Sequence, residues 1–505
     1  MEKKKVAFCL IKAFSSTERL QFKQKIKCGK TAKNGERLEK LFSYLEKAVE
    51  LDNVDEVKSV RLVKILKLSS AKKLTPFYTE LISDLKHFLV ISELEKNKLQ
   101  QQLLLQKALA NREEAQYIEL LHEEIANQIT SIEAPDPEDY QYQAVFYNNL
   151  YIHPSTNTRK EEALVYLNRS ETSLDTSYWI QKLRLLVEKA NRALALAGES
   201  HLLEELPDLP DFRQYTYNDE SHILSIYARV YQLALKPFQD EDLNEVLLSI
   251  KQHSDTIPKG DRERIFNYLM GLINYYIPTQ KTNLSTYHIY QVYKIAFTNL
   301  WLVQDNGLIY FEDFLNMLYL AFEYKDTELL ESIGCDYDEY LSKEYHIFIN
   351  LLSRGYNFFL HQRWEAVLKT FETQDLPDRA YRLHFIMRRN ILELKSLFEA
   401  FVQNKIELDY IPTYFDKHNR FLQRKSDIYS PRFKERNVTF LKMLKRLYVY
   451  LTKRNTFAMD KQKAREDISQ WLRDVEQTGK NTIDQPWLQS IGERLLKEVS
   501  SVASR

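Results

Sequence analysis

Glycine is scarce in this chain: it occurs 10 times among 505 residues, and none lies between Gly35 and Gly198. Glycine provides the positive φ angles that tight β-turns and hairpins require. An average chain is about 7% glycine. A sequence this poor in glycine can form few hairpins and few glycine-rich phosphate-binding loops. We therefore predict an all-α fold in which short connections join one helix to the next.

Cysteine is also rare, and Cys9, Cys28 and Cys335 are widely separated. Because there is no C-x-x-C motif, the sequence indicates neither a structural zinc site nor a dithiol. No apolar run approaches the ~20 residues of a membrane span. The apolar stretch 6–11 is shorter than the core of a secretory signal peptide. We expect a soluble, cytoplasmic protein that does not bind a membrane and holds no metal or cofactor.

The common catalytic and nucleotide-binding signatures are missing as well. The sequence has no GxGxxG, GxxxxGK[ST], HExxH or GxSxG motif. His122 is followed by two acidic residues, but neighbouring residues on a helix do not share a face. Asp336 and Glu339 have the spacing of a helix N-cap and its third residue, which favours capping over metal binding. We expect that the protein is not an enzyme.

Charge is balanced overall, with 71 Lys and Arg against 71 Asp and Glu, but it is uneven along the chain. Cations outnumber acids roughly two to one over residues 1–73 and roughly five to one over residues 424–454. Aromatic residues are abundant, with 32 Tyr and 26 Phe. Tyrosines suit half-buried positions with the ring inside and the hydroxyl outside. This composition favours a thin structure with much half-buried surface.

Helical periodicity and proline positions divide the chain into four predicted parts. Apolar residues at 38, 41, 42, 45, 48 and 49 form one helix face. Thr75 and Pro76 predict a helix start, and the segment Ala134 to Asp139, with two prolines among acids, predicts a linker. We predict a basic helical N-terminal region over 1–74, long helices over 75–135, an α-solenoid of helix pairs over 136–455 and capping helices over 456–505.

One helix pair, over residues 351–377, has a recognisable pattern of small and large side chains. Gly355, Phe358, Val367 and Phe371 occupy the positions of the Gly, Tyr, Ala and Phe of a tetratricopeptide unit, so this segment resembles that repeat. Gln362 stands where the turn glycine is usual, and Arg379 where the proline is usual. Residues 161–196 resemble a second, weaker unit.

The whole layout is similar to an uncharacterised bacterial family of helical-repeat proteins with a basic N-terminus, a TPR-like middle and a basic helix such as residues 420–454. The resemblance implies an α-solenoid of TPR-like helix pairs and implies no activity.

Two basic regions have alternative interpretations. Near the N-terminus, cations spaced along short helices resemble a helix-turn-helix module that would bind nucleic acid through the helix starting at Pro76, or they form a solvated face. The residues of this nucleic-acid alternative are Lys58, Arg61, Lys64, Lys72 and Lys73. In the second region, Phe440, Leu444 and Leu447 form an inward seam, which predicts an amphipathic helix with a charged outer face; the alternative is a surface that binds an anionic partner.

Four arginines lie on one predicted helix: Arg379, Arg382, Arg388 and Arg389. Arg382 and Arg389 are seven residues apart and share a face. Such a face could bind a carboxylate or an acidic peptide, and the alternative is pairing with nearby acids. The predicted partner-binding residues are Arg379, Arg382, Arg389, Tyr381 and Trp364.

From these patterns we expect a non-enzymatic scaffold that binds a peptide or a protein in a concave groove of a helical-repeat fold, because stacked helix pairs expose large curved surfaces. The alternative is a nucleic-acid-binding regulator that uses the basic N-terminal helices.

Overall fold

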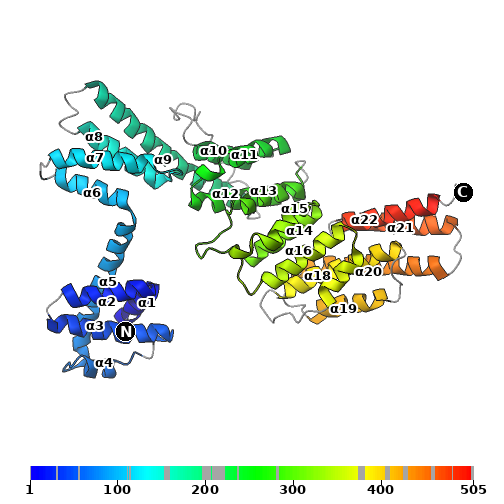
Figure 1. The fold of residues 1–505 in the computed structure, drawn as a ribbon, viewed down its shortest axis with the longest axis horizontal. Helices are drawn as coiled ribbons and strands as arrows, with labels where there is room; N and C mark the ends of the chain where they lie inside the picture. The colour runs from blue at the N-terminus through cyan, green and yellow to red at the C-terminus, as the bar shows by residue number, and fades with distance from the viewer. Residues whose placement is uncertain are drawn as a thin grey trace. The chain divides into compact units, whose positions relative to one another are not determined.

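The structure is a computed structural model that describes residues 2–29, 32–54, 57–110, 112, 115–152, 160–195, 206–207, 222–235, 238–279, 284–372, 382–403, 410–424, 430–456, 461–479 and 482–501. Within these ranges the chain forms 22 α-helices and no β-strand (Figure 1). The predicted all-α class is therefore confirmed. The chain divides into two compact units, one made of residues 1–183 and 209–224 and the other of residues 184–208 and 225–505.

The first unit begins with a helical bundle that has a core of its own. Its helices are α1 (Glu2–Ala13), α2 (Ser16–Gly29), α3 (Ala32–Glu50), α4 (Ser59–Ile65) and α5 (Leu74–Lys96). One cluster of buried residues runs from Ala7 to Phe88. The predicted face of residues 38–49 is buried throughout. The apolar stretch 6–11 lies in α1, where Ala7, Phe8 and Ile11 are buried.

The ends of the bundle's helices agree only partly with the sequence. Ser15 and Glu18 form the capping box that the sequence predicts: the Ser15 amide donates to Glu18 Oε2 (2.7 Å) and the Glu18 amide to Ser15 Oγ (3.2 Å). Helix α5, in contrast, starts at Leu74 with Lys73 at the N-cap, so the cap predicted at Thr75 is wrong. The predicted boundary at residue 74 falls at the start of this helix, whose residues up to Phe88 share the bundle's core.

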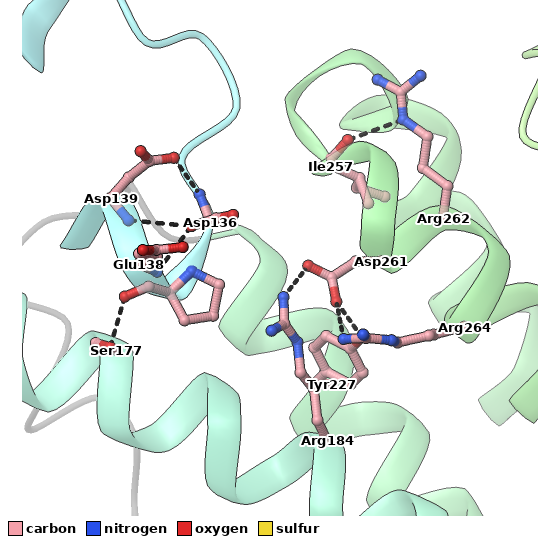
Figure 2. Close-up of polar contacts among 11 residues, drawn as sticks. Asp136, Glu138, Asp139, Ser177, Arg184, Tyr227, Ile257, Asp261, Arg262 and Arg264 are labelled. Atoms are coloured by element: carbon pink, nitrogen blue, oxygen red, sulfur yellow. Dashed lines mark hydrogen bonds and ion pairs between the residues drawn. The ribbon is translucent and has the colours of Figure 1, made fainter. Parts of the chain in front are cut away.

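The rest of the first unit contains α6 (Lys98–Ala110), α7 (Ala115–Thr130) and α8 (Pro137–Ile152), which bury a second core between Leu99 and Leu150. The segment predicted to be a linker instead begins α8. Asp136 Oδ1 accepts the amides of Glu138 (2.7 Å) and Asp139 (3.0 Å), and buried Pro137 is held through its carbonyl by Ser177 Oγ at 2.6 Å (Figure 2). Asp136 is therefore the N-cap of α8, and Pro137 is its first helical residue.

Helix α9 is a single helix from Lys160 to Ala195, so the helix pair predicted over 161–196 is wrong. No glycine or proline interrupts this stretch, and nothing forces a turn. Its residues up to Leu183 belong to the first unit and the rest to the second. Arg184 donates to Asp261, which is 0% exposed and also accepts a hydrogen bond from Tyr227 Oη at 2.5 Å (Figure 2). This buried cluster joins the second part of α9 to α10 and α12.

Besides the second part of α9, and apart from the first three residues of α10, the second unit contains the helices from α10 onward. They are α10 (His222–Leu235), α11 (Asp240–Gln252), α12 (Lys259–Thr279), α13 (Thr286–Thr298), α14 (Phe311–Glu323), α15 (Thr327–Cys335), α16 (His346–Leu360), α17 (Trp364–Glu372), α18 (Arg382–Val402), α19 (Ile411–Arg424), α20 (Pro431–Thr456), α21 (Lys461–Thr478) and α22 (Gln485–Ser501). From α12 to α22 each helix contacts the next, and α16 also contacts α14 and α18 (Figure 1).

Two local features of this unit matter for the sites below. Gly355 of α16 lies against α17, and a Cβ built on it would be 2.7 Å from Phe371 Cζ, so the glycine permits the close approach of the two helices. The turn between them places Gln362 at φ 58°. Further on, a core running from Met387 to Leu495 joins α18 to α22. The predicted seam of Phe440, Leu444 and Leu447 lies in this core with each residue 0% exposed.

Candidate functional site

The predicted partner-binding residues fall in different environments. Trp364 begins α17 and is only 5% exposed; its indole Nε1 donates to Gln403 Oε1 at 3.1 Å, and its ring packs against Phe359. This indole is therefore part of the core and does not present a contact surface. Arg379 and Tyr381 lie outside the described residues, as does the side chain of Arg382. Of the predicted residues, only Arg389 lies at a described surface cavity.

Arg389 lines an open groove between α18 and α19 with a volume of about 760 Å³. From α18, Leu383, Ile386 and Arg389 face the groove, at positions three residues apart. From α19 come residues spaced three or four apart, which makes one face of that helix. They are Thr413, Asp416, Lys417, Arg420, Phe421 and Arg424. The groove therefore combines an apolar floor with a predominantly cationic wall.

The cations of the groove are not equally neutralised. Glu393, which is 3% exposed, pairs with Lys417 Nζ at 2.7 Å and lies 4.0 Å from Arg389 Nε. Arg420 and Arg424 are exposed, and neither forms an ion pair with the described residues. Because exposed guanidinium groups without a partner attract anions and bind carboxylates in bidentate fashion, this wall favours an acidic ligand.

A second cavity, of about 400 Å³, lies deeper in the same unit. Its walls come from α14, α16, α18, α20, the first residue of α13 and the segment before α22. Most of the wall is apolar or aromatic, and the larger of these side chains are Tyr319, Phe322, Tyr356, Met387, Phe433 and Ile483. Small-molecule sites in proteins have this size and this type of lining.

The charged lining of this cavity contains three cations and one acid: Arg388, Lys395, Arg436 and Asp484. Lys395 is 4% exposed, and its ammonium lies 3.5 Å from Asp484 Oδ2 and 4.9 Å from the ring centroid of Phe322. The rings of Phe359 and Trp487 also lie within 5.5 Å of this ammonium. Aromatic faces and a carboxylate together stabilise a buried cation, so Lys395 is fully accommodated.

The two arginines of the cavity lack such a partner. Arg388 Nη2 donates to Asn316 Oδ1 (3.3 Å), and its guanidinium lies 5.4 Å from the Tyr319 ring. Arg436 Nη2 donates to the Thr482 carbonyl (3.2 Å), while its Nε is buried without a hydrogen bond to the described residues. Neither arginine forms an ion pair with a described carboxylate, so the cavity carries excess positive charge.

Acidic and phenolic groups around this cavity hold their protons more strongly than usual. Burial, reinforced by the Asp484 carboxylate, raises the pKa of Glu323 and of Tyr319. Tyr319 Oη donates to Asp484 Oδ1 at 3.5 Å. The same burial and the same neighbouring carboxylate therefore act on both groups.

No known family, curated protein or solved structure matches this chain. The similarity to a bacterial helical-repeat family therefore stays a prediction. Inference about the two sites depends on their own chemistry.

The cations of the nucleic-acid alternative are all accessible in the first unit. Lys58, Arg61, Lys64, Lys72 and Lys73 are exposed, and none forms an ion pair with a described residue. They lie on α4, on the residue before it and on the 3-10 turn Ala71–Lys73 that leads into α5. Arg61 also lies 5.8 Å from the centroid of the Tyr44 ring.

The part of the chain that the structure describes has no group of three or more His, Cys, Asp or Glu side chains placed to hold a metal ion. Among the helices of that same part, none is both long enough and apolar enough to cross a membrane.

The sequence indicates Arg388 as one of four arginines on a helix that could bind a carboxylate, and Arg436 as part of a basic helix. Its patterns did not identify Lys395 and Asp484 as parts of a site. A usable signal exists for α18. Arg388 and Lys395 are seven residues apart, so they lie on the same face of the helix as Ile391 and Leu392. Two cations therefore interrupt an otherwise apolar helix face. Charged residues on the buried face of a helix indicate a polar site inside the fold.

Proposed function

We propose that this chain is a non-enzymatic, cytoplasmic protein-binding scaffold, a solenoid of TPR-like helix pairs that holds an acidic peptide segment of a partner in the groove between α18 and α19. The observation that carries the proposal is the pair of exposed arginines, Arg420 and Arg424, beside the apolar residues Ile386 and Phe421. Arginine and aromatic residues contribute strongly to binding at protein interfaces.

The packing order of the second unit supports the solenoid part of the proposal. Each helix from α12 to α22 contacts its successor, and α16 contacts both α14 and α18. Contact between successive helices is typical of stacked helical repeats. The contacts of this unit are not restricted to successive helices, since Asp484 and α22 also meet α14 and α18. Gly355 against Phe371 gives one pair the small-to-large contact that the tetratricopeptide pattern predicts.

Charge and shape together favour one kind of occupant. The groove offers four cations, at 389, 417, 420 and 424, against Asp416 and the adjoining Glu393. A segment of Asp and Glu residues around an apolar side chain would place the apolar group on Leu383 and Ile386 and its carboxylates on the α19 arginines. Complementary charge of this kind gives specificity and a fast, salt-dependent association.

The test is fluorescence anisotropy with the full chain and a short labelled peptide of leucine and glutamate. We expect binding to the peptide and a fall in affinity of about tenfold or more in the double variant Arg420→Glu, Arg424→Glu, because two attractions become repulsions. Both side chains are exposed and form no ion pair with the described residues, so the fold is retained. Circular dichroism checks this.

A matched variant, Lys463→Glu with Arg465→Glu on α21, changes the net charge equally but does not touch the groove. We expect it to bind the peptide as the unmodified chain does. Equal affinity for a peptide in which glutamine replaces glutamate, or equal weakening by both double variants, would contradict the proposal.

The second candidate function is nucleic-acid binding by the first unit. It is favoured by one observation, the five exposed cations without ion pairs to described residues on α4 and the turn before α5. The residues early in α5 argue against base reading, because Tyr78 and Leu81 are buried in the bundle. Binding by this surface would therefore involve phosphates, which gives salt-dependent affinity without sequence preference.

This second function predicts that a duplex DNA probe shifts in a gel and that its affinity falls steeply with salt. The variant Lys64→Glu, Lys72→Glu, Lys73→Glu is then expected to weaken binding and to lower the salt slope by about 1 for each phosphate that it no longer neutralises. The control, Lys47→Glu, Lys86→Glu, Lys107→Glu, changes equally exposed lysines on α3, α5 and α6. Point substitutions are needed because deletion of 1–74 would expose the buried face of α5. Equal behaviour of the two variants would contradict this function.

A further inference from the structure

We propose that the 400 Å³ cavity between α14, α16, α18 and α20 binds a small organic anion, a carboxylate or phosphate group on an apolar body, through Arg388 and Arg436. This inference is independent of the peptide groove. Arg388 faces the cavity while Arg389, the next residue of α18, faces the groove.

The positive charge of the cavity is only partly compensated. Burying a cation is costly unless an anion or several hydrogen bonds compensate it. Lys395 has its compensation in Asp484 and three aromatic rings. Arg388 and Arg436 are partly buried and line the same cavity, and each has neutral hydrogen-bond acceptors in place of a carboxylate. An anion in the cavity would supply the missing negative charge.

The two guanidinium groups also suit an oxyanion. A guanidinium is planar and presents adjacent N–H groups that match the two oxygens of a carboxylate or phosphate. Arg388 and Arg436 both line the cavity, so a bound oxyanion would accept hydrogen bonds from them.

The apolar walls indicate the body of the ligand. Apart from the charged groups and the polar residues Thr286, His384 and Asn437, the walls are aromatic and aliphatic, with Phe322, Phe433, Met387 and Ile483 among their residues. Inorganic phosphate alone would leave these walls without a partner. A single aromatic ring or a short aliphatic chain that carries one anionic group fits both the volume and the lining.

The experiment is isothermal titration calorimetry with the full chain and four probes: benzoate, phenyl phosphate, uncharged benzamide and inorganic phosphate. We expect at least one of the two aromatic anions to bind about tenfold or more tightly than benzamide, because only the anions engage the arginines. Tighter binding of benzoate indicates a carboxylate ligand, and tighter binding of phenyl phosphate a phosphate ester. Inorganic phosphate is expected to bind more weakly than either.

Two single substitutions test whether the anion binds in this cavity. Arg436→Gln is expected to reduce the affinity for the tighter aromatic anion about tenfold and to leave that for benzamide unchanged. Arg432→Gln is the control, since it removes an exposed cation from the same helix outside the cavity. Benzamide binding as tightly as both anions, absence of binding by both anions, or equal effects of the two variants would overturn the proposal. The comparison of anion with amide needs no variant and decides the matter if Arg436→Gln does not fold.

Discussion

Single residues of the cavity show what a sequence conceals. Asp484 precedes α22, and its pairing with Lys395 of α18 joins two segments that are far apart in the chain. Helical periodicity places Lys395 on the buried face, but it says nothing about which distant carboxylate meets it. The sequence could therefore indicate a charged group inside the fold, whereas its partner and the surrounding aromatic rings depend on tertiary packing.

Gln362 is a residue that the sequence analysis noted as a departure from the tetratricopeptide pattern. It stands where a tetratricopeptide unit usually has its turn glycine, and it has a φ of 58° between α16 and α17. In the left-handed region a residue with a side chain has a conformational free energy about 1–2 kcal/mol higher than that of glycine. The greater conformational freedom of glycine in the unfolded chain offsets part of this difference.

We expect Gln362→Gly to raise the free energy of unfolding by about 0.5–1 kcal/mol, measured by urea denaturation. Gln362 is exposed, so little packing is removed. The neighbouring His361 has a φ of −84° and is also exposed, so His361→Gly should lower the stability. A lower stability in both variants would show that strain at residue 362 is negligible.

The sequence predicted helices correctly where one face of the helix is apolar. It did not predict helix ends correctly where the end depends on a capping residue. The faces at 38–49 and 440–447 are buried as their periods predict. The start of α8 resembles a linker in sequence because Asp136 and Pro137 favour turns and helix starts alike. Helix α9 resembles a helix pair because it carries a weak repeat pattern, yet it contains no helix breaker that could end the first helix.

Helix α18 illustrates how far a helix can depart from a simple amphipathic pattern. Its polar residues Asn390, Glu393, Lys395, Ser396 and Glu399 are all at most 4% exposed. Polar groups on a covered helix need partners inside the protein, and Glu399 Oε1 accepts from Trp487 Nε1 (2.8 Å) and Arg494 Nη2 (2.6 Å). Polar residues on all faces of a sequence segment therefore do not establish that the helix is exposed.

At the scale of the molecule, the predicted divisions at 74, 135 and 455 follow shifts in charge and proline content, and they stay predictions. Buried clusters of the described residues run from Ala7 to Phe88, from Leu99 to Leu150 and from Met387 to Leu495, among others. Charge and proline content indicate exposed segments and the ends of helices. A core is defined by which distant side chains contact each other, and the patterns of a single sequence do not give these contacts.

The two compact units, each with cores of its own, predict two separable unfolding transitions in calorimetry, because a domain with an independent core unfolds cooperatively by itself. Leu41 is 0% exposed in the first unit, so Leu41→Ala should lower only the first unit's stability, by about 2–5 kcal/mol. Gly355→Ala places a Cβ 2.7 Å from Phe371 Cζ and 3.1 Å from Leu392 Cδ2, and should lower only the second unit's stability, by about 1–3 kcal/mol.

Hydrogen exchange with mass spectrometry assigns each transition to its unit. Gly260→Ala is the matched control for the glycine substitution, since a Cβ there meets no atom within 4 Å and the second transition should not fall. If both destabilising substitutions shift one common transition, the units unfold together. Helix α9, which belongs to both, would then be the physical reason, because a continuous helix can couple the cores on either side of it.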